Sequence, residues 1–168
     1  VMTFARASVR LEIARTKRSL FYTAYLLCLA GLLGIAITGD AFNAFVFLEI
    51  NSLSAYVLVS LGRDRRALTA AYQYLIMGTI GATFILIGIG LMYMMTGTLN
   101  MADIASILPG LTTHAAMATA FGFMMVGLWV KMAFFPLHSW LPNAYSLAPT
   151  GAGMMIAPLM TKVTAYLM

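Results

Sequence analysis

The chain has 168 residues and a formal net charge of +5, and 62% of its residues are hydrophobic while only 9% are charged. Soluble domains carry about 25% charged residues, so the composition excludes a soluble domain and predicts an all-α integral membrane protein. A single cysteine, Cys28, excludes a disulfide framework, and we interpret it as a small buried hydrophobe. Eight of the ten Lys and Arg residues lie in two hydrophilic segments, which indicates membrane orientation and not nucleic-acid binding.

The apolar stretches predict a polytopic helix bundle with five transmembrane spans, one of them discontinuous. A basic segment, 1–18, precedes a transmembrane unit that occupies 19–168. Stretches of about 20 apolar residues match the thickness of the hydrocarbon core. The expected spans cover about 19–38, 41–61, 68–95, 114–147 (broken near 134–138) and 151–168. Because the chain starts with Val and stops inside an apolar segment, we expect a fragment of a longer protein.

The loops between the spans predict the orientation. The segments 1–18 and 62–67 are basic and lie two spans apart, so they share one side of the membrane. The turn at 39–40 and the loop at 96–113 lie on the other side and contain no Lys or Arg. The positive-inside rule therefore places 1–18 and 62–67 in the cytoplasm. Within the 96–113 loop, we expect a short helix over 101–107 that begins at an Asn100 N-cap and ends before Pro109-Gly110.

Three ionisable residues fall inside the expected spans: Glu49, Lys131 and Lys162. Intramembrane charges are costly and usually face protein or water, so each is a candidate for a functional residue. Glu49 shares a helix face with three polar residues at helical spacing, Ser52, Tyr56 and Ser60. Structural alternatives remain open: a neutral hydrogen-bonded glutamate for Glu49, a snorkelling lysine for Lys131, and an interface close to Lys162.

A proline-rich stretch, 134–143, interrupts the fourth span. Irregular backbone at membrane depth persists only where protein or a water-filled cavity surrounds it, so the stretch marks a pathway or binding site. His138 lies within it and is either a proton shuttle or a partner for loop carbonyls. Desolvation favours the neutral form of a lysine and a nearby carboxylate favours the charged form. A Glu49–Lys131 pair that separates would thus act as a proton switch, releasing a proton towards His138 and Lys162.

The order and spacing of these motifs resemble the antiporter-like membrane subunits of Mrp-type multi-subunit cation/proton antiporters, and of respiratory complex I and membrane-bound hydrogenases. The segments that carry the resemblance are Phe-Leu-Glu-Ile at 47–50, Thr-Gly-Thr-Leu-Asn-Met-Ala-Asp at 96–103, Val-Lys-Met-Ala-Phe-Phe-Pro-Leu-His-Ser-Trp-Leu-Pro-Asn-Ala-Tyr at 130–145, Ala-Pro-Thr at 148–150 and Thr-Lys-Val at 161–163. The 96–103 stretch and the basic turn after the second span look most like the large D-type subunit of the Mrp antiporters. Pro158 departs from the pattern, and we expect it to kink the last helix.

The resemblance implies that the chain covers about helices 4–8 of a longer subunit. Glu49 would pair with Lys131 on a discontinuous helix, His138 would lie in the break, and Lys162 would continue a polar axis on the next helix. The implied function is proton translocation within a sodium/proton antiporter of the bacterial plasma (inner) membrane. The alternatives are a proton-pumping subunit of an NADH:quinone oxidoreductase or a hydrogenase, without redox chemistry of its own, and a passive membrane scaffold.

The implied partners are other membrane subunits, the lipid bilayer and protons, with sodium left open. No cofactor or metal is expected, because the chain has no flavin, quinone, haem or iron–sulfur motif.

Overall fold

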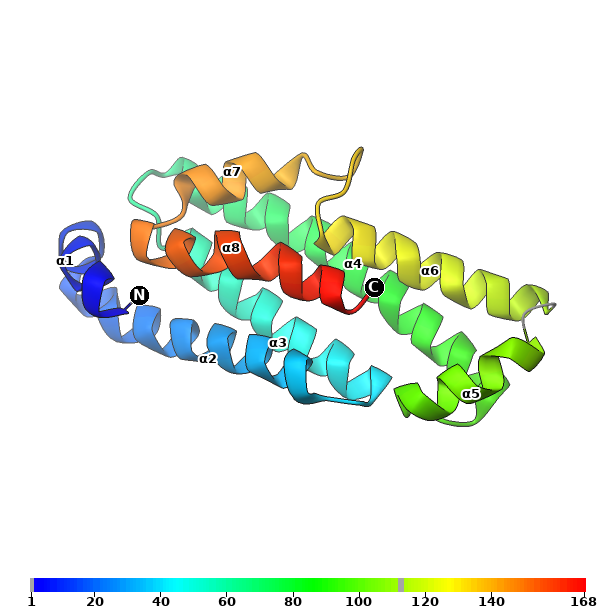
Figure 1. Ribbon diagram of the computed structural model, residues 1–168. Helices are drawn as coiled ribbons and strands as arrows, with labels where there is room; N and C mark the ends of the chain where they lie inside the picture. The colour runs from blue at the N-terminus through cyan, green and yellow to red at the C-terminus, as the bar shows by residue number, and fades with distance from the viewer. Residues whose placement is uncertain (1, 112–113) are drawn as a thin grey trace.

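The described part of the protein is a bundle of long helices that run side by side (Figure 1). The computed structural model describes residues 2–111 and 114–168; Val1 of the expected basic segment and positions 112–113 of the expected 96–113 loop lie outside it. The helices are α1 (Met2–Glu12), the 3-10 turn η1 (Arg15–Lys17), α2 (Arg18–Ile37), α3 (Ala41–Ser60), α4 (Arg66–Thr96), α5 (Met101–Leu111), α6 (Ala115–Lys131), α7 (Trp140–Leu147) and α8 (Thr150–Tyr166).

The first three expected spans are α2, α3 and α4, and each is long and apolar enough to cross a membrane. The fourth expected span consists of two shorter helices, α6 and α7. The irregular segment between them covers 132–139, slightly wider than the expected break. At the last expected span, the helix α8 has 17 residues and continues through Pro158 without interruption. The helical membrane architecture predicted from composition is therefore confirmed.

The helix α5 differs from the expectation at its C-terminal end. Its start follows the prediction, because the Asn100 side-chain oxygen accepts hydrogen bonds from the backbone N–H groups of Ala102 and Asp103. The expectation that Pro109-Gly110 ends the helix is wrong, because α5 continues through Pro109 to Leu111. A proline removes only its own N–H donor, and near a helix end a single missing donor does not terminate the helix.

Two loops that the orientation rule placed on one side of the membrane are joined by backbone hydrogen bonds. The N–H of Ala41 donates to the carbonyl of Leu99 at 2.8 Å, and the N–H of Met101 donates to the carbonyl of Gly39 at 2.8 Å. At the opposite end of the bundle, α1, the α3–α4 connection and the start of α8 lie together (Figure 1). The two basic segments therefore lie at the α1 end of the bundle, and the two loops without basic residues lie at the opposite end, as the orientation rule requires.

The basic N-terminal segment contains a helix with a buried face, α1, which its charged residues did not indicate. Ala5, Val9 and Ile13 are buried at intervals of four residues, so they line one side of α1 and the turn after it. This side packs against α8, where Val9 and Ala5 lie next to Gly151. The basic residues of α1 remain on its exposed side, with Arg6 and Arg10 open to solvent.

Small residues let the helices approach closely. A Cβ on Gly31 of α2 would lie 2.7 Å from the backbone nitrogen of Asn51 on α3. A Cβ on Gly127 of α6 would lie 2.6 Å from the carbonyl oxygen of Gly81 on α4. Both distances are too short for any side chain, so glycine sets the α2–α3 and α4–α6 separations.

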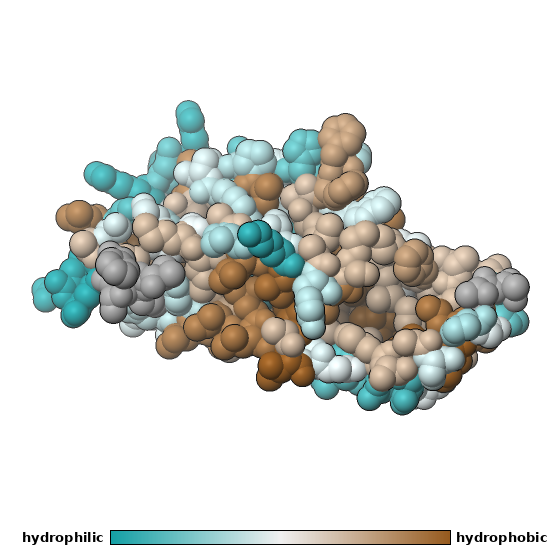
Figure 2. Space-filling model, viewed as in Figure 1, coloured by the Kyte–Doolittle hydropathy of each residue, from teal (hydrophilic) through white to brown (hydrophobic). Residues whose placement is uncertain are grey.

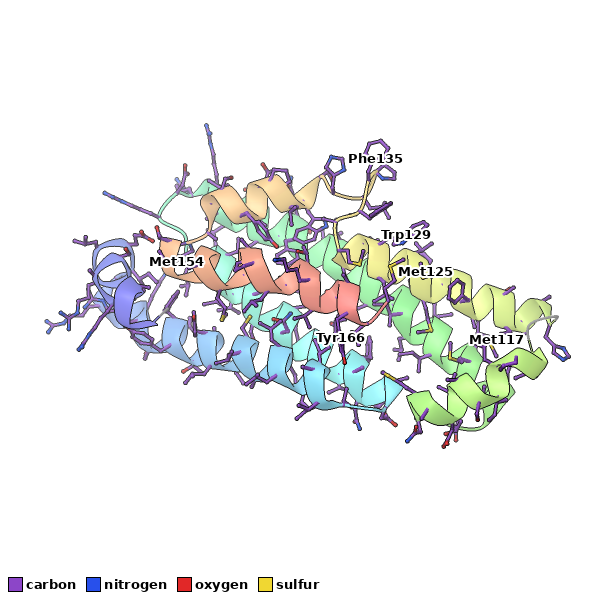
Figure 3. All side chains as sticks on the ribbon, viewed as in Figure 1. Met117, Met125, Trp129, Phe135, Met154 and Tyr166 are labelled. Carbon is purple, nitrogen blue, oxygen red and sulfur yellow. The ribbon has the colours of Figure 1, made fainter. Side chains whose placement is uncertain are left out.

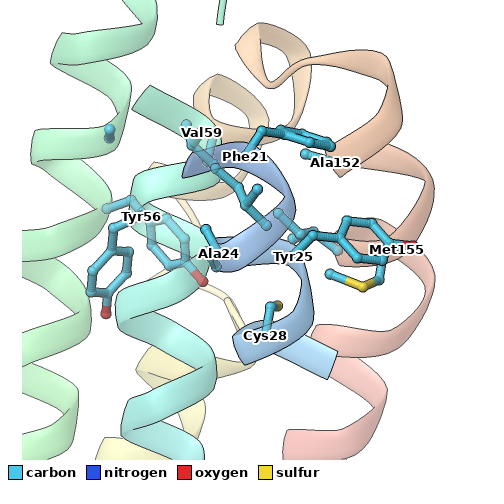
Figure 4. Packing of buried hydrophobic residues seen from close by; sticks show 14 of the residues in the cluster. Phe21, Ala24, Tyr25, Cys28, Tyr56, Val59, Ala152 and Met155 are labelled. Atoms are coloured by element: carbon cyan, nitrogen blue, oxygen red, sulfur yellow. The ribbon is translucent and has the colours of Figure 1, made fainter. Parts of the chain in front are cut away.

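Between α2 and α8, larger side chains fill the core. Figure 4 shows Phe21 next to Ala152 and Tyr25 next to Met155.

The outer surface of the bundle is largely apolar. Leu26 and Leu33 on α2 are 61% and 58% exposed. In the space-filling view, hydrophilic residues gather around the α1 end and the α5 end, and mostly hydrophobic residues lie between them (Figure 2). This distribution is typical of a protein that is surrounded by lipid along its middle.

The carboxylate of Glu12 caps the start of α8 and generates a first prediction. It accepts hydrogen bonds from the backbone N–H of Thr150 at 2.8 Å and from the Thr150 hydroxyl at 2.6 Å. An acidic group at a helix N-terminus accepts a hydrogen bond from an otherwise unpaired N–H, and its negative charge interacts favourably with the helix dipole. We expect Glu12→Ala to lower the free energy of unfolding in detergent by about 1 kcal/mol. Arg6→Ala, an exposed change on the same helix, serves as the control and should have no effect.

Candidate functional site

Lys131 is a buried lysine at the C-terminal end of α6. Its side chain is 3% exposed, although charged residues are almost never fully buried without a partner. It occupies the last turn of α6, where the backbone carbonyls carry partial negative charge and favour a cation. Because Lys131 is the last residue of α6, regular helix precedes it and the irregular 132–139 break follows it.

The buried lysine forms an ion pair with Glu49 of α3. The Lys131 Nζ donates a hydrogen bond to the Glu49 Oε1 at 2.5 Å. The side chain of Glu49 is 21% exposed, so the pair is buried at the lysine and partly open at the carboxylate. Bonds of this kind between two charged groups are stronger than neutral ones. The structure thus brings together the two residues that the resemblance paired, while their role in transport stays a prediction.

Ser52 is a second partner of Lys131. The Lys131 Nζ donates to the Ser52 Oγ at 2.8 Å, and the Ser52 hydroxyl donates to the carbonyl of Leu48 at 2.7 Å. A hydroxyl has one donor and two acceptor lone pairs, so its proton is used by the helix backbone and a lone pair faces the ammonium. The sequence placed Ser52 on the face of Glu49 but did not show that it would contact the lysine.

The neighbouring residue Asn51 faces α2. Its side-chain oxygen accepts a hydrogen bond from the Cys28 thiol of α2 at 2.9 Å, and both residues are buried. Cys28 is therefore buried, as expected, but it is also a hydrogen-bond donor, which the sequence did not indicate. Adjacent polar side chains of α3 tie this helix to α2 on one side and to α6 on the other.

The break after α6 is irregular but ordered by local hydrogen bonds. The N–H of Met132 donates to the carbonyl of Leu128, and the N–H of Phe134 donates to the carbonyl of Trp129 at 2.9 Å. Ala133 lies in the left-handed region, with φ of 54°. In Figure 3, Phe135 projects away from the bundle at the outermost point of this segment, and it is 76% exposed.

The other two candidate residues are not in contact with the ion pair. His138 is exposed, and its ring lies against Phe135 with 5.6 Å between ring centroids. Lys162 is exposed on α8. Within 2–111 and 114–168, no hydrogen bond or ion pair joins either side chain to Glu49 or Lys131. No three His, Cys, Asp or Glu side chains of these residues gather as a metal ion would require.

The family described as "NADH:quinone oxidoreductase/Mrp antiporter, TM" matches residues 38–168. The chain is 53% identical over 146 residues to NADH-quinone oxidoreductase subunit N of Desulforudis audaxviator, covering 87% of this chain and 29% of the relative. It is 33% identical over 153 residues to the D-type subunit of a Na(+)/H(+) antiporter of Bacillus subtilis, covering 90% of this chain and 31% of the relative. The chain thus spans about three tenths of the length of the curated relatives it matches.

The fold is also similar to part of a solved membrane complex. A chain of the membrane-bound sulfane sulfur reductase, an archaeal respiratory membrane complex, superposes with a TM-score of 0.82 and is 37% identical in sequence. The match covers 86% of this chain and 29% of that chain. A chain of the Mrp complex from Dietzia sp. DQ12-45-1b also superposes, with a TM-score of 0.75 and 32% sequence identity over 86% of this chain and 27% of that chain. The structural comparison therefore agrees with the family found from the sequence.

The contact between Glu49 and Lys131 predicts a strong energetic coupling. Removing one member of a buried pair leaves the other without a partner, whereas removing both leaves none. We expect Glu49→Gln and Lys131→Met each to destabilise the purified protein in detergent, and the double variant to lose less than the sum, with a coupling of roughly 0.5–3 kcal/mol. Unfolding followed by denaturant titration measures it. Additive effects would contradict the pairing.

The backbone conformation of Ala133 predicts a substitution that stabilises the protein. An L-residue in the left-handed region costs about 1–2 kcal/mol relative to its preferred conformation, and glycine does not bear this cost. Ala133→Gly should therefore raise the free energy of unfolding by about 1 kcal/mol. Ala118→Gly, an exposed position inside α6, should lower it by a similar amount, so the difference between the two variants reports the backbone conformation alone.

Proposed function

Because the chain belongs to the NADH:quinone oxidoreductase/Mrp antiporter transmembrane family, we propose that it forms a proton-translocating half-channel within a membrane subunit. The observation that carries the proposal is the ammonium of Lys131, 3% exposed and bonded at 2.5 Å to Glu49. A buried amine next to a carboxylate changes its affinity for a proton when the carboxylate approaches or withdraws.

The mechanism follows from the partners of Lys131. With Glu49 and Ser52 in place, the lysine keeps its proton. When α3 and α6 separate by a small distance, the charged hydrogen bond is lost and desolvation favours release of the proton. A factor of ten in proton affinity corresponds to about 1.4 kcal/mol. A modest movement of the carboxylate is therefore sufficient to change the affinity of Lys131 for its proton.

The onward route of the proton is proposed through the break towards Lys162. His138 lies in the irregular segment that follows Lys131, and an imidazole ring can both accept and donate a proton. Lys162 lies on α8, the helix that follows the break and α7. The two side chains do not touch the ion pair, so water molecules in the channel would carry the proton between them.

The distribution of charge supports an orientation. The basic segments 1–18 and 62–67 are proposed to face the cytoplasm of a bacterial plasma membrane. The α1 end of the bundle, where both segments lie, would be the cytoplasmic end (Figure 1).

The surrounding assembly is proposed from the relatives. The identity of 53% with a quinone oxidoreductase subunit, against 33% with an antiporter subunit, favours a complex in which redox subunits drive translocation. A sodium/proton antiporter is the second candidate. Isolation of the intact complex from native membranes separates the two, because co-isolated flavin- and iron–sulfur-containing subunits support the first, and small membrane subunits alone support the second.

Substitution of the ion pair tests the proton path. In the complete protein within its complex, we expect Lys131→Ala and Glu49→Ala each to lower proton flux at least tenfold, measured with a pH-sensitive dye in sealed vesicles. Lys131→Arg is the sharper variant, because arginine keeps the positive charge and the partner but does not release its proton in proteins. We expect it to assemble normally and to lose flux as Lys131→Ala does.

The control is Lys17→Ala, which removes an exposed lysine of η1 and should leave flux unchanged. Wild-type flux in Lys131→Arg would exclude Lys131 as a proton carrier. Wild-type flux in both alanine variants as well would favour the passive scaffold.

A further inference from the structure

The last full turn of α6 is connected to α7 by a buried side chain. The indole N–H of Trp140 donates a hydrogen bond to the carbonyl of Val130 at 3.1 Å. Val130 directly precedes Lys131, and its carbonyl, in the last turn of α6, also accepts a hydrogen bond from the backbone N–H of Ala133 at 3.2 Å. Trp140 is 2% exposed, so the bond forms away from water. Trp140 therefore ties the backbone beside the lysine to the second half of the broken helix.

The ring of Trp140 in turn lies flat on a tyrosine of α4. The Tyr74 and Trp140 ring centroids are 4.2 Å apart, and the planes differ by 3°. Tyr56 of α3 approaches Tyr74 edge-on, at 4.4 Å and 87°. Aromatic pairs of this kind contribute about 0.5–1.5 kcal/mol beyond the area that they bury. Tyr56 follows Ser52 by one helical turn, so the rings also contact the helix that supplies the partners of the lysine.

The far end of this stack reaches α8. The hydroxyl of Tyr74 donates a hydrogen bond to the sulfur of Met160 at 2.9 Å. Tyr74 is 1% exposed and Met160 is 3% exposed. Lys162 follows Met160 by two positions, so the contact holds the turn of α8 that carries the second lysine. An unbroken series of buried contacts thus runs from Val130 through Trp140 and Tyr74 to Met160.

We propose that Trp140 and Tyr74 form a positioning column that couples the position of Lys131 to the presentation of Lys162. The column rests on the proposed function, because it links the two lysines of the proton path. Both residues act through others and touch no proton carrier themselves. When Lys131 loses its proton and leaves Glu49, the end of α6 shifts, and the rigid stack transmits this shift to the turn of α8 around Met160. The column therefore connects the helix that carries the first lysine to the helix that carries the second.

The coupling can be measured without measuring transport. In the complete complex with Cys28→Ser as background, Lys162→Cys introduces a thiol whose alkylation by a water-soluble maleimide reports its exposure. We expect Lys131→Met, which abolishes the charge, to change this alkylation rate about threefold or more when the column is intact. The change should disappear in Trp140→Phe, which keeps a ring but lacks the N–H donor, and in Tyr74→Phe, which keeps the stack but lacks the hydroxyl.

Two matched variants control for general loosening of the bundle. Trp129→Phe alters a tryptophan that stacks on Phe134 outside the column. Tyr72→Phe alters a tyrosine of α4 that is 62% exposed. Both should preserve the response to Lys131→Met.

The proposal is overturned if Lys131→Met has no effect with the column intact, if the effect survives in Trp140→Phe and Tyr74→Phe, or if the controls also abolish it. Flux measurements on Lys131→Arg test the proton path separately, so failure of the column and failure of the proposed function are distinguishable.

Discussion

One charged hydrogen bond, from Lys131 to Glu49, constrains the arrangement of the other helices. A lysine that is 3% exposed is tolerated only when its charge is compensated. The compensation comes from three directions: the carboxylate of Glu49, the lone pair of Ser52 and the negative end of α6. The close α4–α6 approach at Gly81 and Gly127 holds α6 against the bundle. The packing serves to keep one ammonium in contact with one carboxylate.

The break between α6 and α7 is a second consequence of the same requirement. If α6 continued as a regular helix, its end would lose the partial negative charge beside Lys131, because the last carbonyls would be bonded within the helix. Ending the helix there leaves its last carbonyls without their regular helical partners, and the carbonyl of Val130 accepts instead from the N–H of Ala133 and from the indole N–H of Trp140. The end of α6 beside the break thus stabilises a cation, and the buried ring of Trp140 at the start of α7 packs next to it.

Local sequence patterns were sufficient for the three long apolar helices, for the interruption between α6 and α7 and for the positions of Glu49 and Lys131. Hydrophobic length identified α2, α3 and α4, and a charge inside an apolar stretch identified Glu49 and Lys131 without any structure. The contacts that complete the site were not accessible in this way. Ser52 meets a lysine 79 positions away, Tyr74 meets Met160 across 86 positions, and Glu12 meets Thr150 across 138 positions. Contacts at such separations depend on the topology and leave no periodic signal in the chain.

The backbone bonds between the 39–41 turn and the 99–101 loop set how Glu49 can move. They fasten the start of α3 to the end of α4 and the start of α5, so this end of α3 is a fixed pivot. Glu49 lies eight residues further along the helix, a lever arm of about 12 Å. A tilt of about 5° at the pivot displaces a carboxylate on such an arm by about 1 Å. A small tilt of α3 about this pivot is therefore sufficient to break the hydrogen bond between Glu49 and Lys131.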